Sequence, residues 1–108
     1  MVVVEIESNI ETKLEDGKGY ILLGETLSNQ DTRHFRRAFE NLERKNIKEI
    51  YVNMARVNQI DSSGVGILVV CLKRAKEKGG NFKIMFPRDE VKRIFKLVNI
   101  YSYFEIIE

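Results

Sequence analysis

The segment Asp61-Ser62-Ser63-Gly64-Val65-Gly66 places an acid, two hydroxyls and two glycines directly before an apolar stretch. Asp and Ser are preferred at helix N-caps, so the segment is predicted to start a helix. The first N–H groups of a helix lack partners within it, and the helix dipole adds positive potential there. A phosphate on Ser62 would find these donors nearby, and glycines would let another protein approach closely. On residue types alone, a simple helix cap explains the same pattern.

Few other residues could carry catalysis or bind a metal. The chain has one histidine, His34, and one cysteine, Cys71. A nucleophilic Ser62 would need a base and an oxyanion hole, and the G-x-S-x-G motif is absent because Ile60 stands at its first glycine. His34 is predicted to be exposed on a helix among arginines, and Cys71 to be buried in an apolar stripe. We therefore predict no enzymatic activity, no cofactor and no metal site.

Length and composition limit the number of domains and the class of protein. A chain of 108 residues with 44% hydrophobic and 31% charged residues is predicted to form one globular domain, residues 1–108. It contains no apolar run of 18 residues and no signal-peptide pattern. We therefore expect a cytoplasmic protein that does not contact a membrane.

The first part of the chain is predicted to form a β-hairpin. Residues 2–7 alternate as a strand, with Val2, Val4 and Ile6 on one face, and residues 20–23 form a second apolar strand. Asp16-Gly17 is a strong turn dipeptide within the polar stretch between them. The two strands are therefore expected to pair antiparallel.

From Asp31 the hydrophobic period changes to that of a helix, which Asn46 is expected to stop. Its inward positions are Phe35, Ala38, Phe39 and Leu42. Residues 50–54 then form a short apolar strand that is predicted to be central.

The helix that starts at residues 61–62 is expected to stop at Gly79-Gly80. Its predicted buried stripe consists of Gly64, Ile67, Leu68, Cys71, Leu72 and Ala75, widened by Val65, Val69 and Val70. A strand over residues 82–86 follows. A third helix, from about residue 89 to 98, directs Val91, Ile94, Phe95 and Val98 inward. A strand over residues 103–107 ends the chain.

The predicted order is β-β-α-β-α-β-α-β, which indicates an α/β fold with a mixed, mainly parallel sheet and helices packed on it. In such sheets, functional groups gather where strand C-termini meet helix N-termini. That edge includes the loops at residues 24–30 and 54–64.

Residues 57–68, Val-Asn-Gln-Ile-Asp-Ser-Ser-Gly-Val-Gly-Ile-Leu, resemble the signature of STAS domains, in particular bacterial anti-sigma factor antagonists. Gly24-Glu25, Lys78-Gly79-Gly80 and residues 91–95 also fall at that family's places. The resemblance covers nearly the whole chain in the family's strand–helix order. It implies a single STAS domain over residues 1–108.

The resemblance further implies a phosphorylation switch. Ser62 would be phosphorylated by a partner that is both anti-sigma factor and serine kinase, and a PP2C-type phosphatase would reset it. The unmodified form would bind the partner and free the sigma factor, whereas added negative charge beside Asp61 would release it. The implied partner-binding residues are Asp61, Ser62, Ser63, Gly64, Val65, Gly24 and Glu25.

The chain departs from the family's pattern at two places. Leu27 stands where family members often have an Asp, two residues after the Glu of the loop that follows the second predicted strand. The further helix with which the family usually ends has no counterpart after residue 107. We expect more of the sheet or of the first helix to be exposed as a result.

Two non-enzymatic alternatives remain open at this point. The chain could be a STAS scaffold, or a subunit of a sensor or transport complex, whose serine is never phosphorylated. Nucleic-acid binding would need a basic patch interleaved with aromatic residues or a helix-turn-helix, neither of which accompanies the cations near the first two helices. These cations are Arg33, Arg36, Arg37, Lys73, Arg74, Lys76 and Lys78. We predict no direct nucleic-acid contact.

Overall fold

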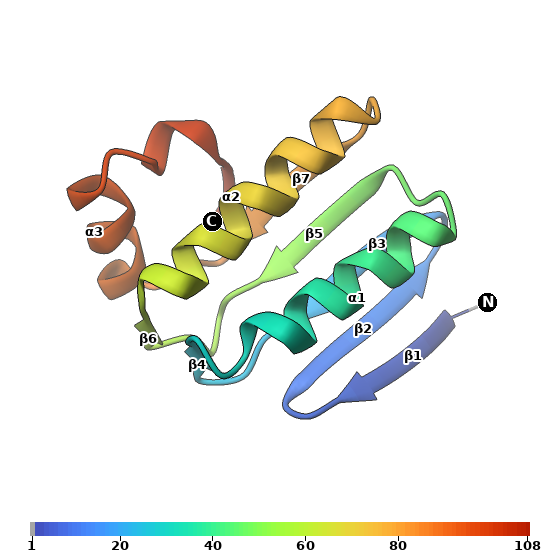
Figure 1. Ribbon diagram of the computed structural model, residues 1–108, viewed down its shortest axis with the longest axis horizontal. Helices are drawn as coiled ribbons and strands as arrows, with labels where there is room; N and C mark the ends of the chain where they lie inside the picture. Colours follow the sequence, from blue (N-terminus) through green and yellow to red (C-terminus); the bar gives the residue numbers. More distant parts are fainter. Residues whose placement is uncertain (1) are drawn as a thin grey trace.

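The computed structural model describes residues 2–108, in which helices α1 and α2 lie side by side across one face of a six-stranded sheet (Figure 1). The sheet strands, in spatial order, are β1 (Val2–Glu7), β2 (Ile10–Glu15), β3 (Lys18–Leu22), β5 (Glu49–Asn53), β7 (Asn81–Met85) and β8 (Glu105–Ile107). The helices are α1 (Thr32–Arg44), α2 (Ser62–Glu77) and α3 (Asp89–Leu97), with a 3-10 turn η1 (Tyr101–Tyr103). Two short strands, β4 (Thr26–Leu27) and β6 (Gln59–Ile60), form a separate parallel pair.

The sheet is mixed, as the sequence predicted. Strands β1, β2 and β3 form an antiparallel meander. Strands β3, β5, β7 and β8 run parallel, and the central position predicted for residues 50–54 is confirmed by β5, which pairs with β3 and β7. The C-terminal ends of β3, β5 and β7 therefore meet at one edge, which is where the candidate site lies.

The predicted pairing of the first hairpin is wrong, because a strand between its two partners escaped the sequence analysis. Asp16-Gly17 does form a turn, with φ of +53° and +76°, but it joins β2 to β3. A second two-residue turn at Ser8-Asn9 joins β1 to β2. Strand β2 looked like a polar loop because alternate positions carry charge on the face away from α1. These charged residues are Glu11, Lys13 and Glu15.

The core lies between the sheet and the helices, and the main buried residues predicted for the first two helices are confirmed. All four inward residues of α1 and all six of α2 are buried. In α3, Val91 and Phe95 are buried, but Val98 is 50% exposed. That prediction is wrong because the helix ends at Leu97, so Val98 no longer follows the helical period. Val70, expected to widen the α2 stripe, is likewise 47% exposed.

The sheet face that points away from α1 and α2 carries its own row of interacting side chains. Tyr20 on β3 and Tyr51 on β5 are register partners, and their rings stack with centroids 5.2 Å apart. Lys83 lies 5.8 Å from the centre of the Tyr51 ring and forms an ion pair with Glu105 at 3.4 Å. Tyr20, Tyr51 and Lys83 are half-buried, and Glu105 is exposed.

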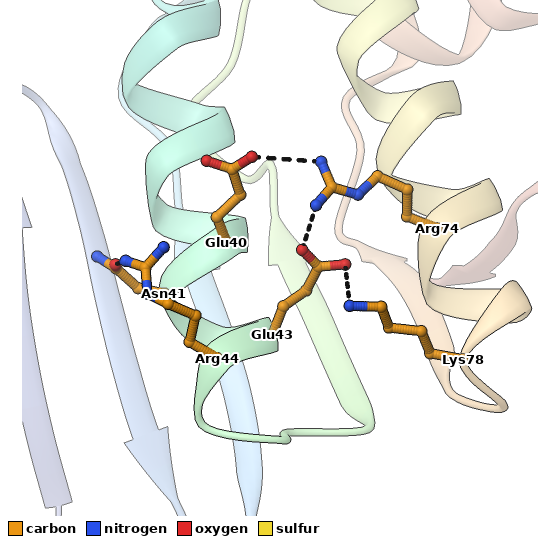
Figure 2. Close-up of polar contacts among 6 residues, drawn as sticks. All are labelled: Glu40, Asn41, Glu43, Arg44, Arg74 and Lys78. Atoms are coloured by element: carbon orange, nitrogen blue, oxygen red, sulfur yellow. Dashed lines mark hydrogen bonds and ion pairs between the residues drawn. The ribbon is translucent and has the colours of Figure 1, made fainter.

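Helices α1 and α2 are joined on their outer side by a cluster of charged residues (Figure 2). The Arg74 guanidinium on α2 donates to Glu40 at 3.4 Å and to Glu43 on α1, and it lies 5.6 Å from the centre of the Phe39 ring. Lys78 adds an ion pair to Glu43 at 3.3 Å. The Glu43 side chain is only 8% exposed, so its charge depends on these cations for compensation.

We expect Arg74→Met to lower the free energy of unfolding by about 1–2 kcal/mol, because it leaves the buried Glu43 carboxylate with Lys78 as its cation. Lys45→Met is the matched control, since Lys45 pairs with Glu5 at 3.0 Å where both side chains are more than 40% exposed. An exposed pair contributes little, and its loss should cost less than about 0.5 kcal/mol. Urea unfolding followed by circular dichroism measures both. Equal losses would contradict the role assigned to the cluster.

Candidate functional site

Asp61 caps helix α2 and at the same time holds a distant loop. Its backbone is extended, with φ of −108°, so the helix begins at Ser62 as predicted. Carboxylate oxygen Oδ1 accepts a hydrogen bond from the N–H of Gly64 at 2.9 Å, and Oδ2 accepts one from the N–H of Asn29 at 2.9 Å. One side chain therefore fixes the start of α2 and its position relative to the loop before α1.

These hydrogen bonds also set the charge of the carboxylate. The N–H groups of Gly64 and then Asn29 stabilise the ionised form and lower the pKa of Asp61 below its ordinary value of 3.8. At neutral pH the residue next to Ser62 is therefore a fixed negative charge. Two nearby N–H donors are already bound to it.

The loop at residues 24–30 is fastened to the segment before α2 by backbone hydrogen bonds. Strands β4 and β6 pair in parallel, so that Leu27 lies opposite Ile60. The Glu25 carbonyl accepts from the N–H of Asn58 at 2.8 Å and of Gln59 at 3.3 Å. The expected proximity of Gly24-Glu25 to the site thus arises through the main chain. Within the pair Gly24 is buried, whereas Glu25 is exposed.

A second aspartate that the sequence analysis did not single out organises the same loop. Asp31 is 8% exposed, and its Oδ2 accepts hydrogen bonds from the Thr26 hydroxyl at 3.0 Å and from the Ser28 N–H at 2.8 Å and hydroxyl at 3.0 Å. Leu27, the residue noted above as a departure from the resemblance, is fully buried. The spacing Ser-x-x-Asp directly before a helix was the available signal for this turn.

The residues around the start of α2 divide into exposed and packed ones. Asp61, Ser62 and Gly66 are exposed, and Ser63 and Val65 are half-buried. Gly64, which was expected on the contact surface, is buried, so that expectation is wrong. A Cβ added to Gly64 would lie 2.0 Å from the carbonyl oxygen of Leu27, whereas one added to Gly66 would meet nothing within 4 Å. Gly64 is therefore needed for close packing of α2 on β4.

The single histidine and the single cysteine, which could have supported catalysis, lie outside this site. The Nδ1 of His34 is 3.0 Å from Glu7 of β1, and the side chain is 32% exposed, so it is more enclosed than expected. Cys71 is buried as predicted, and burial raises the pKa of its thiol to about 12.

Within residues 2–108 no three His, Cys, Asp or Glu side chains gather as a metal site would require. None of the helices described is long and apolar enough to cross a membrane.

Comparison with known proteins places the chain in a family. A model of the STAS domain family matches residues 3–108. The chain belongs to the STAS domain family. A Thermotoga maritima protein assigned to the anti-sigma factor antagonists is 31% identical over 62 residues, 57% of this chain and 55% of that protein. An anti-sigma-B factor antagonist of Staphylococcus aureus is 24% identical over 100 residues, 93% of each chain.

Solved structures of anti-sigma factor antagonists show the same fold. A crystal structure from Thermotoga maritima, also assigned to the anti-sigma factor antagonists, superposes with a TM-score of 0.83 at 23% identity, covering 90% of this chain and 84% of that one. The anti-sigma factor antagonist SpoIIAA in its unphosphorylated form gives 0.73 at 16% identity, covering 100% and 89%. A structure of SpoIIAA in its phosphorylated form is similar as well, with a TM-score of 0.67. The fold predicted from the sequence is therefore confirmed.

The two glycines at the start of α2 should respond oppositely to the same substitution. Gly64→Ala forces a methyl group against the Leu27 carbonyl, and we expect it to lower the free energy of unfolding by about 1–3 kcal/mol. Gly66→Ala lies in open space within the helix, and it should be neutral or stabilise by up to about 1 kcal/mol. Urea unfolding of both variants tests this. A loss at Gly66 matching that at Gly64 would contradict this account, because a Cβ at residue 66 meets no neighbour and alanine favours the helix more than glycine does.

The lowered pKa of Asp61 gives its hydrogen bonds a defined pH dependence. The stabilisation is fully present above the ordinary pKa of 3.8 and is lost as the pH falls through the lower folded value. We expect Asp61→Asn to be less stable than the unmodified chain at neutral pH, because an amide cannot accept both N–H groups as a carboxylate does. The difference should shrink below pH 3.8 in urea unfolding at a series of pH values. A difference that stays constant with pH would contradict this account.

Proposed function

We propose that the chain is an anti-sigma factor antagonist controlled by phosphorylation of Ser62. In its unmodified form it binds an anti-sigma factor that is also a serine kinase and so frees the sigma factor. Phosphorylation of Ser62 by that kinase releases the partner, and a PP2C-type phosphatase restores the binding form. The chain itself acts by binding and not by catalysis. The names of its relatives support the partner class.

The observation that carries the proposal is an exposed serine, Ser62, that directly follows Asp61 and is the first residue of α2. Exposure makes the hydroxyl accessible to a kinase. The backbone at this position is fixed by the cap and by the β4–β6 pair, so the kinase meets one defined conformation. Gly66, one turn further along the helix, leaves the adjoining surface free of a side chain.

The geometry also favours release as the effect of phosphorylation. A phosphate adds about −1.5 to −2 charges at neutral pH. At many helix N-termini free N–H groups would bind it, but here Asp61 already accepts hydrogen bonds from Gly64 and Asn29. The new charge is added beside an existing one. In a partner interface such an uncompensated charge costs about 2–5 kcal/mol, or roughly 30- to 4,000-fold in affinity.

We expect Ser62→Asp to weaken binding to the anti-sigma factor kinase at least about 30-fold, whereas Ser62→Ala should retain binding and abolish phosphorylation. Ser63→Ala, a change of the adjacent hydroxyl, should still be phosphorylated. Isothermal titration calorimetry measures the affinities. Intact-mass spectrometry with peptide mapping of protein from its own cells locates the phosphate.

Two results would count against the proposal in different ways. A phosphate absent under every growth condition, together with undiminished binding by Ser62→Asp, would favour a STAS scaffold in which Ser62 serves only to start a helix. A phosphate found on Ser63 in place of Ser62 would keep the switch and overturn its assigned position.

A further inference from the structure

Strand β1 forms one edge of the sheet (Figure 1), and its outer side is open to pairing with another strand. It is six residues long, pairs with β2 without a bulge, and contains neither Pro nor Lys, the residues that commonly protect sheet edges. Val2 and Val4 are each 48% exposed, and Ile6 is 72% exposed. The opposite edge strand, β8, has only three residues.

The hydrogen-bonding groups of β1 that face outward can be assigned from the register. Glu7 and Ile10 close a two-residue turn, and such a pair exchanges hydrogen bonds, after which bonded and non-bonded pairs alternate. Residues 3, 5 and 7 of β1 therefore bond to β2. The N–H and carbonyl groups of Val2, Val4 and Ile6 point away from the sheet. The turn between β2 and β3 gives the same alternation, since its closing pair is Glu15 and Lys18.

The charged and the apolar side chains of β1 lie on opposite faces of the sheet, and this separation favours pairing with a second strand. Glu5 and Glu7 point toward α1, where Lys45 pairs with Glu5 and Arg37 with Glu7. Val2, Val4 and Ile6 point to the other face, where Val4 is the register partner of Lys13. The carboxylates that would repel an approaching chain are thus already paired with cations, and the apolar side chains extend the open face.

We propose that β1 pairs antiparallel with β1 of a second copy of this chain, about a two-fold axis at Val4. In this register Val4 lies opposite Val4 of the second copy, and Val2 lies opposite Ile6. All outward-facing residues then meet outward-facing residues, so each such pair exchanges two hydrogen bonds. The side chains of the same pairs form a continuous apolar strip on the open face.

Two competing registers are worse on the same criteria. Centring the axis on Glu5 places two Glu5 carboxylates directly opposite one another and leaves Val2 without a partner among residues 2–7. Centring it on Ile6 places Glu5 opposite Glu7. Like charges at directly opposed positions destabilise an antiparallel pair. The Val4 register instead sets Val3 opposite Glu5, so no two carboxylates are directly opposed among residues 2–7.

The first test is the mass of the native-sequence chain, with no residues added before Met1, measured by light scattering over a range of concentrations. We expect the mass to approach twice the 12.6 kDa of one chain. Ile6→Lys should give a monomer. Leu97→Lys is the matched control, because Leu97 is 75% exposed at the end of α3 and should leave the dimer intact. A monomer at every concentration, or a dimer unaffected by Ile6→Lys, would overturn the proposal.

The second test fixes the register. Hydrogen-bonded partners have Cα atoms about 5.5 Å apart, within the range of a disulfide, so Val4→Cys should give a covalent dimer on mild oxidation. Glu5→Cys is the control, because two cysteines at this position would be diagonal neighbours about 7–8 Å apart and should not crosslink. The natural Cys71 is buried with a raised pKa and should not compete. Crosslinking of Glu5→Cys but not Val4→Cys would overturn the register.

Discussion

The two hydrogen bonds of the Asp61 carboxylate are the interaction on which the site depends. Helix α2 could begin with any N-cap residue, but a hydroxyl cap has one oxygen and would satisfy only the helix. A carboxylate has two, and here the second binds the N–H of Asn29 across 32 positions of sequence. The start of α2 and the loop before α1 are therefore held together, which gives the exposed Ser62 a defined surrounding surface.

The absence of a side chain at Gly64 makes this arrangement possible. The Leu27 carbonyl comes close enough to α2 that a Cβ at residue 64 would overlap it, while the same carbonyl accepts the N–H of Asp61 at 3.4 Å. Buried Leu27 in turn anchors β4 in the core. Residue 27, for which the resemblance implied an acid, is thus used for packing in this chain. The loop acquires its buried carboxylate from Asp31 instead.

Helices could be predicted from the sequence where the hydrophobic period and the capping residue indicated the same element. Residues whose role depends on a contact with a distant part of the chain could not be predicted from their spacing. The stripes of α1 and α2 and the cap at Asp61 follow from local patterns. Strand β2 was missed because its outward face is fully charged, and a half-buried strand with charged alternate positions resembles a polar loop. Gly64 and Asp31 act through Leu27 and Ser28, so their roles depend on tertiary contacts and loop geometry. The partner-binding role of the site residues stays a prediction.

Helix α1 lies between the two surfaces proposed for interaction, and its contacts indicate how they are related. On one side Lys45 and Arg37 bind the glutamates of β1, and on the other Glu40 and Glu43 bind Arg74 of α2. Both sets of contacts are made by the charged end groups of long side chains on or directly after α1. The opposite face of α1 is buried in the core. A charge added at Ser62 meets neither set, since Arg74 lies three turns further along α2. Phosphorylation would therefore change what binds at the start of α2 without changing the β1 edge, and a dimer would present two switches that act independently.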